Sequence, residues 1–117
     1  MEKWKFGIDN NGLIDLVLSG KKVATCSIYN GEKTIVGDYS ILLNDKNREI
    51  CKLKTIDIII LKFKDITWDL ASLEGEFSNL KEWKESHYNF FKKENNEFNE
   101  DVLIEFEKFE VVEIFKK

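Results

Sequence analysis

Apolar residues first gather in a short segment near the N-terminus, at positions 13–18. A turn signal of Asp, Asn, Asn and Gly precedes this segment and offers Asn10 or Asn11 as the N-cap of a helix. Gly20 follows it, and glycine is common just past a helix because it adopts the left-handed backbone conformation without strain. The pattern therefore predicts a helix that ends at about Ser19.

Four further segments have the patterns typical of strands. Residues 25–29 and 39–43 are short and largely apolar, and turn-forming residues bound them. Residues 49–63 alternate at first and then become apolar throughout, which predicts a long strand buried on one face and then on both. In the last segment, 104–112, the apolar positions change parity near Lys108, which predicts a β-bulge or a break into two strands.

Two helices are predicted between the long strand and the last one. A short helix is expected from Thr67 or Asp69 to Glu74. The sequence Asn79-x-x-Glu82 resembles a capping box and predicts the start of the second helix. Along that helix, residues at helical spacing predict a buried stripe: Leu80, Trp83, His87, Phe90 and Phe91.

The order of the predicted elements is helix, three strands, two helices and a long or broken strand. A strand as long as 49–63 in a small protein usually bends or coils around a barrel. We therefore expect an α+β fold built on a curled, mostly antiparallel β-barrel with flanking helices. The length of 117 residues fits a single domain over residues 1–117.

Charge is divided unevenly along the chain. Residues 1–64 carry eleven Lys or Arg and eight Asp or Glu, whereas residues 65–117 carry seven Lys and fourteen Asp or Glu, for a net charge of −4. Binding to a long phosphate backbone needs several clustered basic residues, which this sequence lacks. The charge pattern therefore favours a nucleoside, a single flipped base or a short RNA loop over long nucleic acid.

The sequence predicts neither a membrane anchor nor a metal site. No apolar run is long enough to cross a bilayer, and the residues after Met1 form no apolar signal. Cys26 and Cys51 lie in strand-like segments and, with His87 as the single histidine, match no metal-ligand spacing. We expect buried, reduced thiols, no cofactor and no metal, in a cytoplasmic protein.

Polar chemistry is concentrated between two apolar elements, in the stretch from Lys21 to Thr25. Lys21 and Lys22 follow the first helix, where the negative end of the helix dipole stabilises their charge and accounts for them without any function. Alternatively, Lys22 is held over a cleft that it shares with Thr25. Residues three apart face opposite sides of a strand, so this second interpretation requires residues 20–24 to form a turn.

Several short motifs, taken together, resemble the ASCH domain family, whose fold is similar to the PUA domain of RNA-modifying enzymes. They span almost the whole chain: Trp4-x-Phe6-Gly7, the run from Leu16 to Thr25, Val36-Gly37-Asp38-Tyr39, Glu74-Gly75-Glu76, Trp83-x-x-x-His87-x-x-Phe90-Phe91 and Phe109-Glu-Val-Val112. The resemblance implies a β-barrel with flanking helices. It also implies a cleft, beside the Gly-x-Lys motif, that binds RNA or a nucleobase derivative.

An activity follows from the same resemblance. Some small bacterial ASCH proteins look like amidohydrolases that remove the acetyl group from N4-acetylcytidine with a Lys, a Thr and a Glu, and these positions fall on Lys22, Thr25 and Glu74. Other members resemble ribonucleases, and eukaryotic members are parts of coactivators. The alternatives are therefore an RNA-binding module or ribonuclease without amidohydrolase activity, and a protein-interaction module. Ser27 stands where an Arg is common, so a charged fork for carboxylate or phosphate is missing.

The three residues that the resemblance selects are able to carry amide hydrolysis. Lys22, partly desolvated and next to Lys21, would act as a base toward the Thr25 hydroxyl or a water. Glu74 would pass the proton to the departing exocyclic amine. The ligand would be a nucleoside or a short single-stranded RNA.

Aromatic residues and the single histidine are candidates for the wall of the site. His87 is either a core or boundary histidine bonded to the backbone or a member of the cleft. Large aromatic side chains either pack in the core or stack on a base, since aromatic faces bind bases without charge. The candidate ligand-binding residues are therefore Lys21, Ser27, Trp68, Trp83, His87 and Tyr88.

Overall fold

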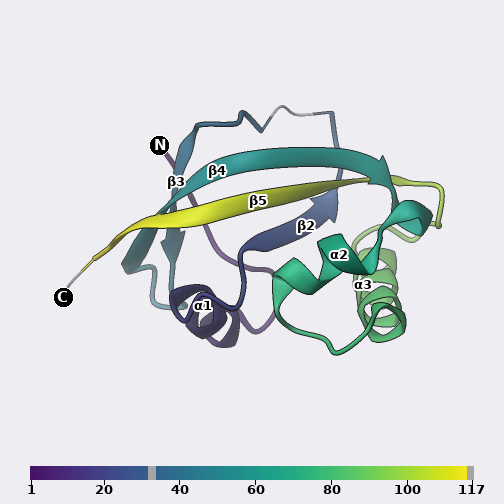
Figure 1. Ribbon diagram of the computed structural model, residues 1–117, viewed down its shortest axis with the longest axis horizontal. Coiled ribbons are helices and arrows are strands. Elements are labelled where there is room, and N and C mark those ends of the chain that lie inside the picture. The colour runs from purple at the N-terminus through teal and green to yellow at the C-terminus, as the bar shows by residue number, and fades with distance from the viewer. Residues whose placement is uncertain (32–33, 116–117) are drawn as a thin grey trace.

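The computed structural model describes residues 1–31 and 34–115. Within these residues, five strands form one sheet in the order β1-β3-β4-β5-β2, and three α-helices lie against it (Figure 1). Two short 3-10 turns flank α2. The elements are β1 (Glu2–Trp4), α1 (Asn10–Leu18), β2 (Ala24–Ile28), β3 (Tyr39–Leu43), β4 (Glu49–Lys62), η1 (Phe63–Asp65), α2 (Trp68–Ala71), η2 (Ser72–Glu74), α3 (Leu80–Glu94) and β5 (Leu103–Ile114).

The sheet is curled and mostly antiparallel. β4 and β5 are its longest strands, and they curve side by side over the helices in Figure 1. β1 pairs with β3 in parallel, and the other neighbouring strands are antiparallel. Because β1 and β2 are the two edges, the sheet is a half-barrel. The predicted α+β fold, with a curled, mostly antiparallel sheet and flanking helices, is confirmed.

The pairing of β4 with β5 is irregular where the sequence indicates a change of parity. Thr55 pairs with Phe109, but Asp57 pairs with Lys108, so Ile56 is an extra residue in β4. The predicted bulge near Lys108 is therefore present, with its extra residue on the partner strand. A bulge increases local twist, which helps a long strand to coil.

The start of α1 differs from the prediction. Its N-cap is Asp9, which has left-handed backbone angles (φ 44°, ψ 46°) and makes no side-chain cap bond. The prediction of Asn10 or Asn11 as the N-cap was wrong. The side chain of Asn10 instead accepts from the Phe6 N–H at 2.8 Å and donates to the Leu43 carbonyl at 3.0 Å, so it joins the helix to the segment after β1 and to β3.

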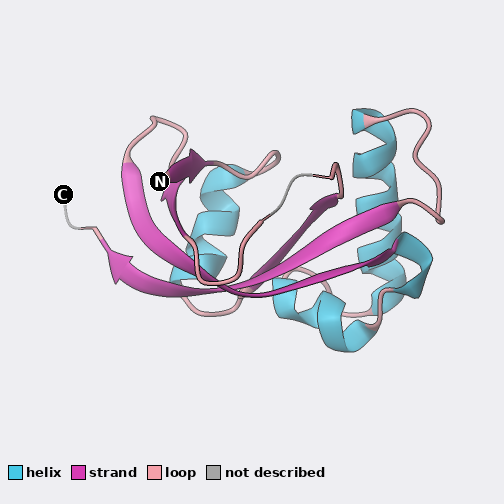
Figure 2. Ribbon diagram, turned by 90° about the horizontal axis from the view of Figure 1, so that it is seen from above, coloured by secondary structure: helices cyan, strands magenta, loops and turns pink. Residues whose placement is uncertain are grey.

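Two hydrophobic clusters fill the interior. Figure 2 shows α1 toward one end of the sheet and α2 and α3 toward the other, and each group of helices covers one cluster. The first cluster is Ala24, Phe63, Ile66, Ala71, Trp83, Phe91, Phe98, Ile104 and Phe106; the second is Ile14, Val17, Leu42, Cys51, Leu53 and Phe109.

The predicted capping box opens α3, where the Asn79 side chain accepts from the Glu82 N–H at 2.9 Å.

Candidate functional site

The turn after α1 carries Lys22 into the interior. Gly20 has a φ of 81°, and the N–H groups of Gly20 and Lys21 donate to the carbonyls of Val17 and Leu16 at 3.1 and 3.0 Å. This is the Schellman pattern, which a glycine just past a helix favours. The predicted helix end is confirmed, and the chain turns before β2 begins.

Lys22 forms a buried ion pair with Glu74. The two residues are 1% and 2% exposed, so almost no part of either meets solvent. The Lys22 Nζ donates to Glu74 Oε1 at 3.1 Å and to Glu76 Oε2 at 2.7 Å. Removing a charge from water costs several kcal/mol, which only close partners offset. Two carboxylates around one ammonium meet that requirement.

Gly75 allows the two carboxylates to reach the same ammonium. Its φ is 72°, and a Cβ at this position would lie 2.2 Å from the carbonyl oxygen of Lys21. Next to this contact, the Val23 N–H donates to the Leu73 carbonyl at 2.9 Å. The segments 21–23 and 73–75 therefore pack backbone against backbone, and this contact fixes the ion pair.

Both oxygens of Glu74 have further partners. Trp83 Nε1 donates to Oε2 at 2.7 Å, and His87 Nε2 lies 3.4 Å from Oε1. Burial raises the pKa of Glu74, but the hydrogen bond with His87, the charge of Lys22 and the bond from Trp83 outweigh burial and leave that pKa below its usual value. We call Lys22, Glu74, Glu76, Trp83 and His87 the ion cluster.

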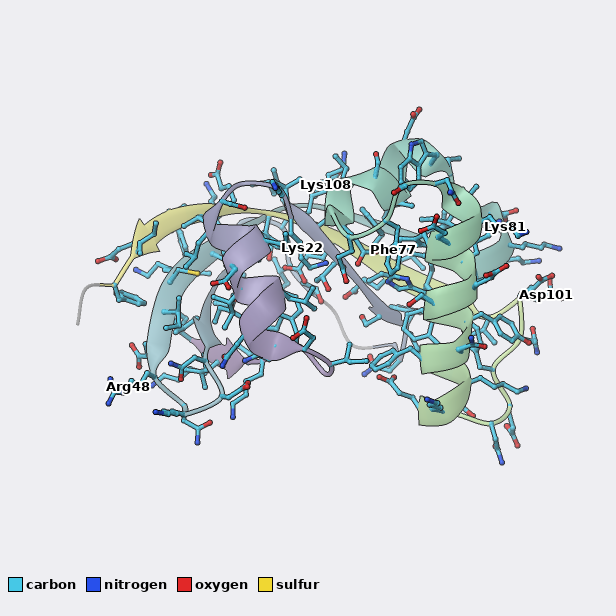
Figure 3. The ribbon with its side chains drawn as sticks, turned by 90° about the horizontal axis from the view of Figure 1, so that it is seen from below. Lys22, Arg48, Phe77, Lys81, Asp101 and Lys108 are labelled. Atoms are coloured by element: carbon cyan, nitrogen blue, oxygen red, sulfur yellow. The ribbon has the colours of Figure 1, made fainter. Side chains whose placement is uncertain are left out.

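The ion cluster lies between the two hydrophobic clusters. Trp83 belongs to the first cluster, and Phe6 packs against the second. The Lys22 Nζ is 5.4 Å from the centre of the Phe6 ring, within the range of a cation–π contact. Figure 3 shows Lys22 between α1 and α3, the helices that cover the two clusters. The ion cluster therefore joins the two halves of the interior.

A hollow of about 710 Å³ lies beside the ion cluster. Successive side chains of a strand point to opposite faces. Ala24 and Cys26 of β2 and Ile104 and Phe106 of β5 pack in or against the first hydrophobic cluster, whereas the odd-numbered polar residues next to them line the hollow. Thr25 pairs with Glu107, and Ser27 pairs with Glu105. All four of these residues line the hollow.

The wall of the hollow is acidic. Among the described residues, its carboxylates are Glu2, Asp38, Glu94, Glu105 and Glu107, and its one lysine is Lys5. Burial raises the pKa of Glu107; the hydrogen bond from Thr55 at 2.7 Å opposes this rise, and the charges of Glu105 and Glu2 add to it. We call this space the acidic hollow.

Three side chains belong both to the wall of the acidic hollow and to the surroundings of the ion cluster. Phe6 lines the hollow and contacts Lys22. Cys26 also lines it, and the pKa of its thiol is raised well above the usual value, first by burial and then by the charge of Glu74. Phe91 lines it too, and its ring centre is 5.9 Å from that of His87. The ion cluster therefore lies behind this wall.

The structure brings some of the sequence-predicted residues together and separates others. Lys22, Glu74, Trp83 and His87 form one hydrogen-bonded group. Thr25 lines the acidic hollow with Ser27, whereas the side-chain partners found for Lys22 are the two glutamates and Phe6.

The other three candidate residues lie outside both regions. Lys21 is exposed at the end of the turn. Trp68 packs against the first hydrophobic cluster. The Tyr88 ring contacts those of Phe63 and Phe98, with centroids 5.9 and 5.4 Å apart.

Sequence reasoning missed two features of the site. Glu76 is the closer carboxylate to Lys22, and the Glu74-Gly75-Glu76 motif held the signal, because a left-handed glycine lets its two neighbours turn toward one partner. The acidic face of β5 was the second: Glu105 and Glu107 alternate with apolar residues, a pattern that usually indicates solvent exposure.

Neither a metal-binding group nor a membrane-spanning helix is found among the described residues. Within residues 1–31 and 34–115, His, Cys, Asp and Glu side chains form no group of three or more that could hold a metal ion. Over the same part of the chain, every helix is too short or too polar to pass through a bilayer.

The curled half-barrel with its flanking helices is a PUA-like domain. The chain belongs to the ASCH domain family, whose model matches residues 2–113. It is similar to a crystal structure of a protein from Enterococcus faecalis, with a TM-score of 0.89 and 30% identity over 97% of this chain and 77% of that one.

Two other solved structures are also similar. An ASCH domain from Lactobacillus crispatus has a TM-score of 0.87 and 32% identity over 96% of this chain and 79% of that one. A hypothetical protein with 19% identity has a TM-score of 0.66 over 94% of this chain and 99% of its own, which is a likeness of fold. None of the curated proteins compared with the chain matches it.

Proposed function

We propose that this ASCH domain protein binds a nucleobase-containing ligand in the acidic hollow and hydrolyses the acyl group of an N4-acylated cytidine. The observation that carries the proposal is the buried pair of Lys22 and Glu74 directly behind a hollow that Thr25 lines. Charged groups are costly to bury, and a buried carboxyl with a shifted pKa beside a cavity is a candidate for chemistry. Some small bacterial ASCH proteins look like amidohydrolases that use a Lys, a Thr and a Glu, and these positions fall on Lys22, Thr25 and Glu74.

In the proposed reaction, water replaces the exocyclic amine on the acyl carbon. The Thr25 hydroxyl attacks that carbon, and its proton passes to the Glu74 carboxylate. Glu74 gives a proton to the exocyclic nitrogen as the C–N bond breaks. Water then releases the acyl group as a carboxylic acid. The products are cytidine and acetate when the substrate is N4-acetylcytidine.

Lys22 has a different role here from the base that the sequence suggested. Its Nζ donates to two carboxylates, so it is not placed to accept a proton from Thr25. We assign its ammonium to orienting Glu74 and to stabilising negative charge that develops on the acyl oxygen. Because Lys22 is 1% exposed, the Phe6 ring would have to move aside when the ligand enters.

The acidic wall supports a nucleoside as the ligand. Carboxylates accept hydrogen bonds from the exocyclic N–H of cytosine, and the hollow offers Glu105 and Glu107 beside Thr25. The same carboxylates repel phosphate, which disfavours an RNA with a long footprint. The volume of about 710 Å³ is within the range of small-molecule sites.

The proposal is tested by measuring acetate release from N4-acetylcytidine. Thr25→Ala should reduce kcat/KM by about 100-fold or more, because it removes the attacking hydroxyl. Thr67→Ala is the matched control, since Thr67 is exposed, lies outside the hollow and makes no side-chain cap bond. An active Thr25→Ala variant, or a wild-type protein that releases no acetate, would contradict the proposal.

The salt dependence of ligand binding distinguishes the proposed function from the alternative, an RNA-binding module or ribonuclease. Binding through phosphates weakens steeply as salt is raised, whereas a nucleoside in an acidic hollow shows little salt dependence. Titration of a short single-stranded RNA and of cytidine at several salt concentrations compares the two directly. Tight, strongly salt-dependent RNA binding with no hydrolysis of acylated cytidine would favour the alternative.

A further inference from the structure

Aromatic rings hold His87 in one orientation. Its ring stacks on that of Trp83, with centroids 4.0 Å apart and an interplanar angle of 15°. The rings of Phe77 and Phe91 contact it at 5.8 and 5.9 Å, and Figure 3 shows Phe77 beside α3. The His87 side chain is 13% exposed. Its choice of hydrogen-bond partners is therefore limited to those within this enclosure.

Each ring nitrogen of His87 faces an oxygen atom. Nδ1 is 3.0 Å from the carbonyl oxygen of Trp83, and Nε2 is 3.4 Å from Glu74 Oε1. A backbone carbonyl only accepts hydrogen bonds, so Nδ1 carries a hydrogen. Turning the ring over would place carbon atoms opposite both oxygens and would lose both bonds.

The contact at Nε2 requires a second hydrogen. An ionised Glu74 also only accepts, so a neutral ring with its hydrogen on Nδ1 would direct a lone pair at Oε1. The contact is attractive only when a proton lies between the two atoms. We infer that one proton is held between His87 Nε2 and Glu74 Oε1 at neutral pH, with His87 as an imidazolium and Glu74 as a carboxylate.

The charges of the neighbouring groups support this assignment. The ion cluster otherwise contains one cation, Lys22, against two carboxylates, Glu74 and Glu76. A protonated His87 makes the numbers of positive and negative charges equal, as buried ionic groups require. Cys26, which interacts with the charges of Glu74, Lys22 and Glu105, adds no charge of its own at neutral pH because its pKa is raised.

The properties of Glu74 explain which partner keeps the proton. Although burial raises it, the pKa of Glu74 is lowered overall by its hydrogen bonds and by the charge of Lys22. A carboxyl of this kind does not retain a proton by itself at neutral pH. If it is to act as an acid, it needs a neighbour that supplies the proton.

This inference deepens the proposed hydrolysis and rests on it for its catalytic meaning. The proton would move from His87 Nε2 to Glu74 and on to the departing nitrogen as the C–N bond breaks and the new C–O bond forms. The pair would then regain the proton that Thr25 releases. Because His87 acts through Glu74, it is a positioning residue.

The protonation state of His87 is directly measurable by NMR. It is the single histidine of the chain, so 15N labelling gives one pair of ring-nitrogen signals. At pH 7.5 we expect both nitrogens of the wild-type ring to be protonated, and we expect the Nε2 proton to be absent in Glu74→Gln. Glu85→Gln is the matched control, because it removes the same charge from an exposed position on α3, the helix that carries His87.

A wild-type ring protonated only at Nδ1, beside an ionised Glu74 carboxylate seen by 13C NMR, would overturn the inference. This NMR measurement needs only the wild-type protein, so it tests the inference even if Glu74→Gln fails to fold. A Glu74→Gln ring that keeps both protons in a folded protein would also overturn it, since the carboxylate would then not be what holds the proton.

The kinetics of a His87 variant provide a second test, with a result that a purely structural role of His87 would not produce. His87→Gln keeps a donor toward Glu74 but supplies no proton, so we expect kcat to fall by about 10- to 100-fold with KM little changed. The pH profile of kcat should change as well. A shared proton without any hydrolysis would support the inference and reject the proposed function, whereas hydrolysis with a neutral His87 would do the reverse.

Discussion

The ion cluster and the acidic hollow differ in how their charges are balanced. In the ion cluster, the buried Lys22 has carboxylate partners at 3.1 and 2.7 Å, and Glu74 receives donors on both oxygens. In the hollow, Glu105 and Glu107 have hydroxyl partners from Thr34 and Thr55, and five carboxylates share a wall with one lysine. One region is compensated from within the protein, and the other is not.

The difference indicates what each region does. Lys22 and Glu74 are 1% and 2% exposed, so neither charge can be solvated by water and each needs the other as its partner. Their pairing therefore stabilises one arrangement of the chain. In the hollow, burial and then the charges of Glu105 and Glu2 raise the pKa of Glu107, so its charge weakens the fold slightly, but a ligand that donates a hydrogen bond to it would offset this cost. We therefore propose that the ion cluster holds the reacting charged groups in one arrangement and that the hollow selects the ligand.

The largest expected effect comes from breaking the compensation at Lys22. Lys22→Met keeps an unbranched side chain of similar length but removes the ammonium that Glu74 and Glu76 share, so we expect the free energy of unfolding to fall by about 3–5 kcal/mol. Urea denaturation followed by circular dichroism measures the change. Lys21→Met, at the exposed neighbouring position, should change stability by no more than about 0.5 kcal/mol. Equal losses in the two variants would contradict the buried pairing.

The next effect tests the backbone contact that fixes the ion cluster. Gly75→Ala places a Cβ 2.2 Å from the Lys21 carbonyl oxygen at a φ of 72°, so the two segments must separate. Gly20→Ala is the matched control: its φ is 81°, but nothing lies within 4 Å of the added atom. Backbone strain alone costs about 1–3 kcal/mol, and we expect Gly75→Ala to cost more than Gly20→Ala. Similar thermal denaturation of the two variants would show that the contact is unimportant.

The fold was largely predictable from the sequence because its signals are local. Gly20 marks the end of α1, Asn79 and Glu82 mark the start of α3, and the long apolar run marks β4. The N-cap of α1 was predicted wrongly, because Asn10 serves a tertiary contact with β3 that no local pattern reveals.

The candidate site was predictable only in part, for the same physical reason. The resemblance to the ASCH family selected Lys22 and Glu74, but they are 52 positions apart in the sequence, so no local pattern predicts that they form an ion pair. The carboxylates of β5 looked like a solvent face, because alternation does not say whether the polar side meets water or a hollow. How charges are compensated depends on the fold and cannot be read from composition.

A smaller effect follows from the pH dependence of Glu74. Its pKa is lowered in the folded protein, so its ionised form adds stability that is fully present above the unfolded value of about 4.3 and is lost as pH falls through the folded value. The stability difference between wild type and Glu74→Gln should therefore shrink as the pH is lowered from 7 toward 3. Glu85→Gln, exposed on α3, should show no comparable narrowing. A constant difference across this range would mean that Glu74 gains nothing from its partners.

The smallest expected effect has the opposite sign and belongs to the hollow. Burial raises the pKa of Glu107, so its charge opposes folding at neutral pH, and Glu107→Gln should stabilise the protein by at most about 1 kcal/mol while keeping an oxygen for Thr55. The gain should disappear at low pH, where the wild-type carboxyl is already protonated. Glu110→Gln, on the exposed part of β5, is the control.

The same Glu107→Gln variant also tests the assignment of ligand selection to the hollow. If the carboxylate accepts from a cytosine N–H, the more stable variant should bind cytidine more weakly, because a neutral amide oxygen is a poorer acceptor than a carboxylate. Calorimetric titration of both proteins with cytidine measures this. A variant that gains stability without losing affinity would place the ligand elsewhere, whereas a gain in stability with a loss in affinity would show that the unbalanced charge is retained for binding.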